Sequence, residues 1–189
     1  MTPLSATALL QVLGLTLLLV IAVIHDMRAR RIPNFLILTG LGLAVSLHTV
    51  ALLIDSASLA GYAWWSPLAG LMTGLATLMP LYLLRATGAG DVKLMGMIGA
   101  FIGTQPVLAA TFYTFLAGGL LSLAFMFRPG VARQALANVR FLVSDWVLRT
   151  NTGQGLRLAP LKTTAARLPY AVAIALGTGA ALRWPLISP

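Results

Sequence analysis

The stretch Leu4–Ile24, LSATALLQVLGLTLLLVIAVI, runs for 21 residues without a charged side chain. A hydrocarbon core of about 30 Å needs roughly 20 apolar residues in a helix that crosses it. The rest of the chain has the same character, because 59% of the 189 residues are hydrophobic and only 9% are charged. So many apolar side chains cannot all be buried inside a small soluble fold. The composition therefore predicts an all-α, polytopic membrane protein and excludes a soluble domain or a disordered chain.

Five further apolar stretches follow the first one along the chain. The fourth of the six is too short to cross alone, so it begins inside the membrane or follows a loop that dips into it. A proline stands at or just before the start of four of these helices, where helix entry tolerates it. We expect about six transmembrane helices in a single membrane domain, 1–189. Their expected bounds are 4–24, 35–54, 67–84, 92–102, 106–127 and 169–186.

The positive charges predict the orientation of these helices. With the 25–34 loop in the cytoplasm, twelve of the thirteen Lys and Arg residues fall on the cytoplasmic side, and the 54–66 loop has none. Basic residues concentrate in cytoplasmic loops, so we expect both termini outside the cytoplasm. The net charge of +9 is then explained by topology and by contact with anionic lipid. Nucleic-acid binding is not expected, because the Arg residues are scattered over three loops.

One polar stretch, 128–167, separates the last two apolar stretches. Seven apolar side chains recur in it at helical spacing, with Arg133 and Arg140 on the opposite face. This pattern predicts an amphipathic helix that lies on the cytoplasmic membrane surface. Its simplest role is that of a lipid-anchored connector, and the alternative is a surface that helps to present a substrate.

The chain has four acidic residues, all of them Asp. We expect Asp55 in a solvated outer loop and Asp145 in a modest ion pair with Arg149. Asp26 and Asp91 instead lie at the cytoplasmic ends of the first and fourth spans, on the same side and at the same depth. A carboxyl group near apolar surroundings is costly and indicates a functional site. Two such groups together would share one proton, as in aspartic proteases, where one activates water and the other donates to the carbonyl.

The same two acids permit other interpretations. Each could cap a helix or pair with a neighbouring Arg28, Arg30 or Lys93. They could also relay protons or hold a cation in a small transporter, although transporter acids belong near the membrane midplane. The chain has no Cys, no His/Asp cluster of metal-ligand type and no serine nucleophile motif. We therefore expect no metal site and no cofactor.

Three stretches resemble the type IV prepilin peptidase family. The stretch Asp26–Asn34, DMRARRIPN, resembles its first-aspartate motif, and Gly88–Met95, GAGDVKLM, resembles its Gly-x-Gly-Asp-x-Lys second-aspartate motif. The stretch Leu168–Ala175, LPYAVAIA, is similar to its Pro-Tyr-containing last span. The resemblance implies that Asp26 and Asp91 are the catalytic carboxylates, with water as the nucleophile and the roles of acid and base left open. The supporting motif residues are Pro33, Asn34, Gly88, Gly90 and Lys93.

The resemblance also implies a substrate. This family removes the short basic leader peptide from prepilins and pseudopilins at the cytoplasmic face of the inner membrane, ahead of their hydrophobic helix. Larger members carry a four-cysteine zinc site and also methylate the mature pilin. Because this chain has no Cys, it resembles the short, peptidase-only subgroup that serves Flp-type (tight adherence) pili. Archaeal preflagellin peptidases have a similar plan, and presenilin-like intramembrane proteases, which share the Gly-x-Gly-Asp element, are a further alternative.

Overall fold

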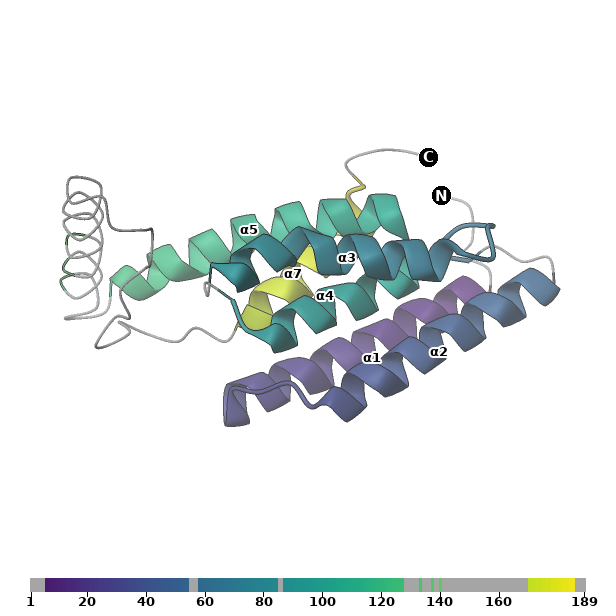
Figure 1. The fold of residues 1–189 in the computed structure, drawn as a ribbon, viewed down its shortest axis with the longest axis horizontal. Coiled ribbons are helices and arrows are strands. Elements are labelled where there is room, and N and C mark those ends of the chain that lie inside the picture. Colours follow the sequence, from purple (N-terminus) through teal and green to yellow (C-terminus); the bar gives the residue numbers. More distant parts are fainter. Residues whose placement is uncertain are drawn as a thin grey trace, which may run out of the picture. The chain divides into compact units, whose positions relative to one another are not determined.

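The computed structural model describes residues 6–54, 58–84, 87–127 and 170–185, together with Arg133, Ala137 and Arg140. Every regular element in these ranges is a helix, and Figure 1 shows the helices coloured in chain order. The prediction of an all-α protein is confirmed. The helices are α1 (Ala6–Ala29), α2 (Asn34–Leu53), α3 (Ser66–Leu83), α4 (Ala89–Ile102), α5 (Thr104–Met126) and α7 (Tyr170–Arg183).

Four helices, α1, α2, α3 and α5, are long and apolar enough to cross a membrane. The prediction of a polytopic membrane protein is therefore also confirmed. The helices α4 and α7 have 14 residues each, which is about 21 Å of helix and less than the hydrocarbon thickness. A crossing by these two helices stays a prediction.

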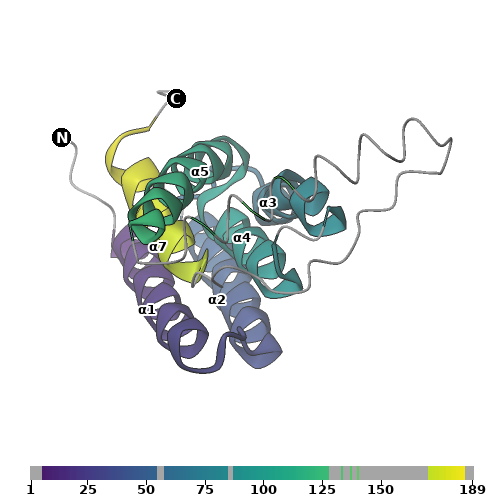
Figure 2. The same cartoon turned by 90° about the vertical axis from the view of Figure 1, so that its left-hand side faces the viewer.

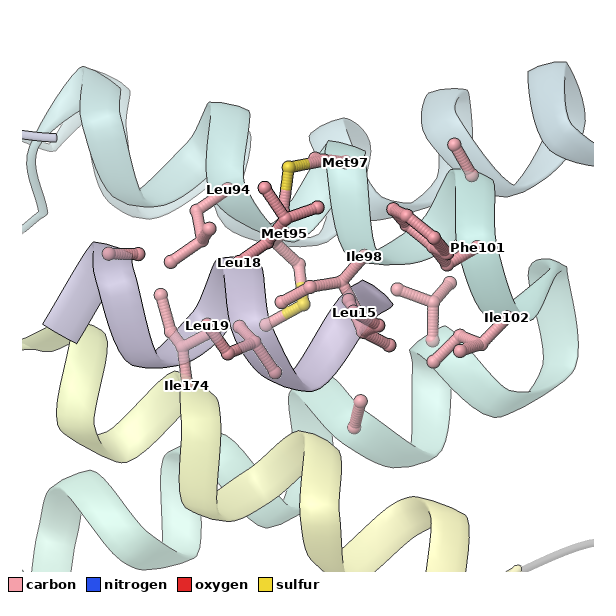
Figure 3. Close-up of a cluster of buried hydrophobic side chains, with 14 of the residues drawn as sticks. Leu15, Leu18, Leu19, Leu94, Met95, Met97, Ile98, Phe101, Ile102 and Ile174 are labelled. Atoms are coloured by element: carbon pink, nitrogen blue, oxygen red, sulfur yellow. The ribbon is translucent and has the colours of Figure 1, made fainter. Parts of the chain in front are cut away.

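The short helix α4 is buried on all sides from Leu94 to Ile102. Ten of its residues between Val92 and Ile102 are buried, and it contacts α1, α2, α3 and α7, which Figure 2 shows around it. A helix that is apolar all round and covered by protein need not match the thickness of the lipid. Burial therefore explains why this apolar stretch is shorter than the others. Figure 3 shows its side chains against those of α1 and α7, with Leu94, Met95, Ile98, Phe101, Ile102, Leu15, Leu18, Leu19 and Ile174 labelled.

Glycines bring α3 and α4 into backbone contact. A Cβ atom placed on Gly70 would overlap the Gly99 carbonyl, and one on Gly74 would overlap the Met95 carbonyl. Small residues four apart allow this close approach between membrane helices. The contact fixes the position of α4 relative to α3. Asp91 lies in the first turn of α4, one turn before Met95.

We expect Gly74→Ala to destabilise the protein by about 1–3 kcal/mol, the usual cost of overpacking. The added methyl group has no room beside the α4 backbone. Gly42→Ala is the matched control, because a Cβ atom there meets nothing within 4 Å. Thermal unfolding in detergent micelles measures both variants, and equal midpoints for the two would contradict the close α3–α4 contact.

The first-aspartate motif, residues 26–34, covers the end of α1, the turn after it and the first residue of α2. Helix α1 continues to Ala29, five residues beyond the expected span end at Ile24, so Asp26 lies inside the helix. Arg30 then ends it with a positive φ of 51°, a conformation that L-residues adopt singly at helix ends. The Pro33 carbonyl accepts the first hydrogen bond of α2 from the Leu36 N–H at 3.1 Å.

A buried polar network connects α1 and α2 at the end of the pair opposite to the 30–33 turn. The His48 Nε2–H donates to the Ala63 carbonyl at 3.0 Å, because a carbonyl oxygen can only accept. Nδ1 then accepts from the Ser58 hydroxyl at 2.8 Å, and the Gln11 amide donates to the same hydroxyl oxygen at 3.0 Å. The α2–α3 connection is thereby tied to both helices.

Contacts divide the chain into two units, residues 1–118 with 169–189 and residues 119–168. The helices belong to the first unit, except that α5 continues into the second. Of the predicted amphipathic segment 128–167, only Arg133, Ala137 and Arg140 are described, and all three are helical. The rest of that segment lies outside the described residues, and the expectation of a single domain stays a prediction.

Candidate active site

Asp26 is a buried carboxylate near the end of α1, and its side chain is 9% exposed. Its Oδ2 atom accepts a hydrogen bond of 3.1 Å from the Ala171 N–H at the start of α7. The first N–H groups of a helix have no partner within the helix, so a carboxylate is well placed there. Asp26 thus links the first helix of the chain to the last one described.

Asp91 lies in the first turn of α4, three residues after Gly88, the residue that caps the helix. Its Oδ2 atom accepts a hydrogen bond of 3.1 Å from the Gly88 N–H. Asp91 stands ahead of the 92–102 stretch that is expected in the membrane. Burial raises the pKa of its carboxyl from 3.8 to about 6, against the lowering effect of the Gly88 hydrogen bond and with a further rise from the charge of Asp26.

The two acids therefore interact. The negative charge of Asp26 acts on the Asp91 carboxyl, and α1 and α4 are in contact. Burial is the main cause of the raised pKa and the charge of Asp26 adds to it, so Asp91 retains its proton to a higher pH than an exposed Asp does. Such a pair can act as base and acid in a single hydrolytic reaction.

The supporting motif residues join the two motifs to each other. The Lys93 Nζ donates a hydrogen bond of 2.9 Å to Asn34 Oδ1 at the start of α2. Gly90 faces Ile32, whose side chain would lie 3.4 Å from a Cβ atom at this position. The loop that ends in Pro33 therefore runs along the first turn of α4. Lys93 therefore has a specific partner in the first motif.

The start of α7 is the part of the site that residue types alone did not reveal. The Ala171 N–H binds Asp26, and the charge of Asp91 acts on the Tyr170 hydroxyl. In the sequence, the only sign was the similarity of the Pro-Tyr stretch to a family motif. A backbone N–H has no signature in a sequence, so its aim at Asp26 could not be inferred there.

The chain has two acidic residues besides Asp26 and Asp91. Asp55 and Asp145 lie outside the described residues. Within the described ranges, no group of three or more His, Cys, Asp or Glu residues could hold a metal ion. The site as described offers two carboxyl groups, each with a backbone N–H partner.

Comparison with known proteins identifies the family. Residues 13–123, more than half of the chain, match the type IV leader peptidase family. The matched region contains both aspartates and the Gly88–Lys93 motif, whereas α7 lies beyond it. No curated protein and no solved structure matches the chain. On the extent of the family match and the two motifs inside it, this multi-pass membrane protein belongs to the type IV leader peptidase family.

Proposed function

We propose that the protein is a membrane aspartic endopeptidase that removes the basic leader from type IV prepilin-like precursors at the cytoplasmic face of the inner membrane. The observation that carries this proposal is the approach of Asp26 and Asp91. They come from separate motifs and separate helices, yet the charge of one acts on the other. Both lie at helix ends, within the last turns of α1 and the first turn of α4. This position favours a peptidase over a transporter, whose acids belong near the membrane midplane.

The raised pKa of Asp91 supports an assignment of roles. Asp91 is the acid that carries the proton, and Asp26 is the carboxylate that acts as base. Asp26 takes a proton from water as the water oxygen bonds to the scissile carbonyl carbon, and Asp91 gives its proton to the carbonyl oxygen. As the tetrahedral intermediate collapses, the C–N bond breaks and Asp26 gives its proton to the leaving amine. One hydroxyl of the intermediate returns a proton to Asp91, so the pair ends as it began.

An apolar cavity of about 260 Å³ lies between α1 and α7. On α1 its lining runs from Leu15 to Ile24, about 14 Å of helix that ends two residues before Asp26. On α7 it begins at Ala175, one turn after Ala171. A hydrophobic segment that follows the scissile bond would therefore find an apolar groove that leads away from the two acids. We propose that side chains of the hydrophobic helix of the prepilin pack into this groove.

We expect Gly179→Leu to raise the KM for prepilin about 10-fold or more, because the new side chain occupies the space of an apolar substrate group. Gly179 lines the groove, and a Cβ atom there meets no other atom within 4 Å, so the helix should tolerate the change. The kcat should stay the same. Gly42→Leu is the control, since Gly42 on α2 has equally open surroundings. An equal rise in KM for both variants would argue against the groove.

The test of the proposed function is cleavage by the purified full-length protein. The protein is placed in lipid nanodiscs with a full-length Flp-type prepilin, and products are followed by gel shift and mass spectrometry. We expect one cut directly after the basic leader, in the presence of serine, thiol and chelating inhibitors. Failure to cleave any prepilin, together with proton flux in sealed vesicles, would support the transporter instead. A cut inside the hydrophobic helix would support a presenilin-like protease.

We also propose that the protein belongs to the short, peptidase-only subgroup of the family. Because the chain has no Cys, it lacks the residues for the four-cysteine zinc site of the bifunctional members. We propose a peptidase without N-methyltransferase activity that serves Flp-type pili. The mass of the N-terminal peptide of the mature pilin, measured after incubation with S-adenosylmethionine, tests the first half. Comparison of kcat/KM for Flp-type prepilins and other prepilins tests the second.

A further inference from the structure

The first turn of α7 is hydrogen-bonded to Asp26. The Ala171 N–H donates to Asp26 Oδ2 at 3.1 Å, and the Tyr170 hydroxyl lies within the electrostatic influence of Asp91. Asp26 and Ala171 are 145 residues apart in the chain. The family match ends at residue 123, so this part of the site lies outside it.

Packing on two sides holds the start of α7 in place. The side chain of Ala171 is 0% exposed, which leaves the first turn little freedom to move. The Tyr170 ring lies against Gly118 on α5, where an added Cβ atom would be 3.1 Å from the ring. The position of the Ala171 N–H is therefore set by contacts with other helices as well as by α7 itself.

This hydrogen bond leaves one oxygen of Asp26 for chemistry. Because Oδ2 already accepts a hydrogen bond from the Ala171 N–H, the other carboxylate oxygen, Oδ1, is the one expected to accept the proton of the water molecule. A base must lie within hydrogen-bond distance of the proton that it takes, and a displacement of about 1 Å can cost about 100-fold in rate. We infer that Tyr170 and Ala171 are positioning residues that hold the Asp26 carboxylate in its catalytic orientation. The inference rests on the proposed function.

The direct test removes one N–H group and leaves every side chain in place. Replacement of Ala171 by lactic acid, its α-hydroxy analogue, converts the Ala171 amide into an ester and is made by amber suppression in cell-free synthesis with nanodiscs. We expect kcat for prepilin cleavage to fall about 10- to 100-fold, the usual effect of losing a hydrogen bond to a charged group. The KM should change less than about twofold, because the N–H binds Asp26 and no part of the substrate.

Lactic acid at Ala173 is the matched control. It removes a backbone N–H from the same part of α7 and replaces the same residue type, but not the N–H that Asp26 accepts. A general weakening of α7 would lower the thermal midpoint and activity of both esters alike. A fall in kcat confined to the Ala171 ester supports the inference, and equal activities of the two esters overturn it.

A pair of ordinary substitutions tests the same point if the esters fold poorly. Gly118→Ala presses a methyl group against the Tyr170 ring, whereas Gly119→Ala adds one where nothing lies within 4 Å. We expect kcat to fall about 3- to 10-fold for Gly118→Ala, since a displacement of a few tenths of an ångström reaches Asp26 through α7. Gly119→Ala should retain the wild-type kcat. Wild-type kcat in both would overturn the inference.

These outcomes are separate from those of the proposed function. If the wild type cleaves no prepilin, the proposed function fails. If the wild type cleaves and the Asp26 variant does not, the function stands, and the two ester variants, or the Gly118→Ala and Gly119→Ala pair, decide whether α7 positions the base.

Discussion

Asp26→Asn and Asp91→Asn should each reduce kcat/KM for prepilin by at least about 1,000-fold, because each removes one half of the acid–base pair. An Asn side chain has nearly the same shape as Asp, and its amide oxygen can still accept the hydrogen bond that Ala171 donates to residue 26 or that Gly88 donates to residue 91. The fold should therefore survive. The measurement is leader removal by the purified variants, followed by mass spectrometry.

The chain supplies its own controls, since it has only four acidic residues. Asp55→Asn and Asp145→Asn remove the same charge from acids that we expect in a solvated loop and in an ion pair. Both variants should cleave prepilin at the wild-type rate. Cleavage retained in Asp26→Asn or Asp91→Asn would refute the pair, and a loss in all four would point to general damage by loss of negative charge.

The second large effect is a loss of activity as the pH rises. The proposed mechanism needs the proton on Asp91, and the pKa of Asp91 is raised from 3.8 to about 6. Below that pH the group is mostly protonated, and above it kcat/KM should fall about tenfold for each pH unit, since it follows the protonation of the free enzyme. Because the group is half protonated at pH 6, the expected loss from pH 6 to pH 8 is about 50-fold. The profile is measured with prepilin held well below its KM.

The cause of this raised pKa can be tested independently of cleavage. Burial is its main cause, and the charge of Asp26 adds to it. Asp26→Asn removes that charge, so the pKa of Asp91 should be lower in this variant than in the wild type. Infrared titration of the protonated carboxyl band measures the midpoint, with Asp91→Asn used to assign the band. An unchanged midpoint would mean that the two carboxyl groups do not interact.

Much of the fold follows from local sequence. A run of about 20 apolar residues predicts a membrane helix because lipid leaves backbone groups no partner outside the helix. Helices α1, α2, α3 and α5 lie where such runs predict them. Helix α1 continues five residues past its apolar run to Ala29, since a helix need not end at the boundary of the hydrocarbon. The short α4 was recognisable as unusual, but the burial of its residues 94–102 depends on the four helices around it.

The candidate site also combines residues that can be recognised from the sequence with contacts that depend on the fold. Asp26 and Asp91 could be found from sequence, because each belongs to a short motif whose residue types and spacing can be read directly. The hydrogen bonds of Lys93 with Asn34 and of Ala171 with Asp26 could not. They join segments that are 59 and 145 residues apart, and one donor is a backbone group that every residue except proline possesses. The identities of the acids are thus a property of the sequence. The effect of the Asp26 charge on Asp91, and the proton that Asp91 is expected to hold, come from packing, since burial and the distance between charges exist only in the folded chain.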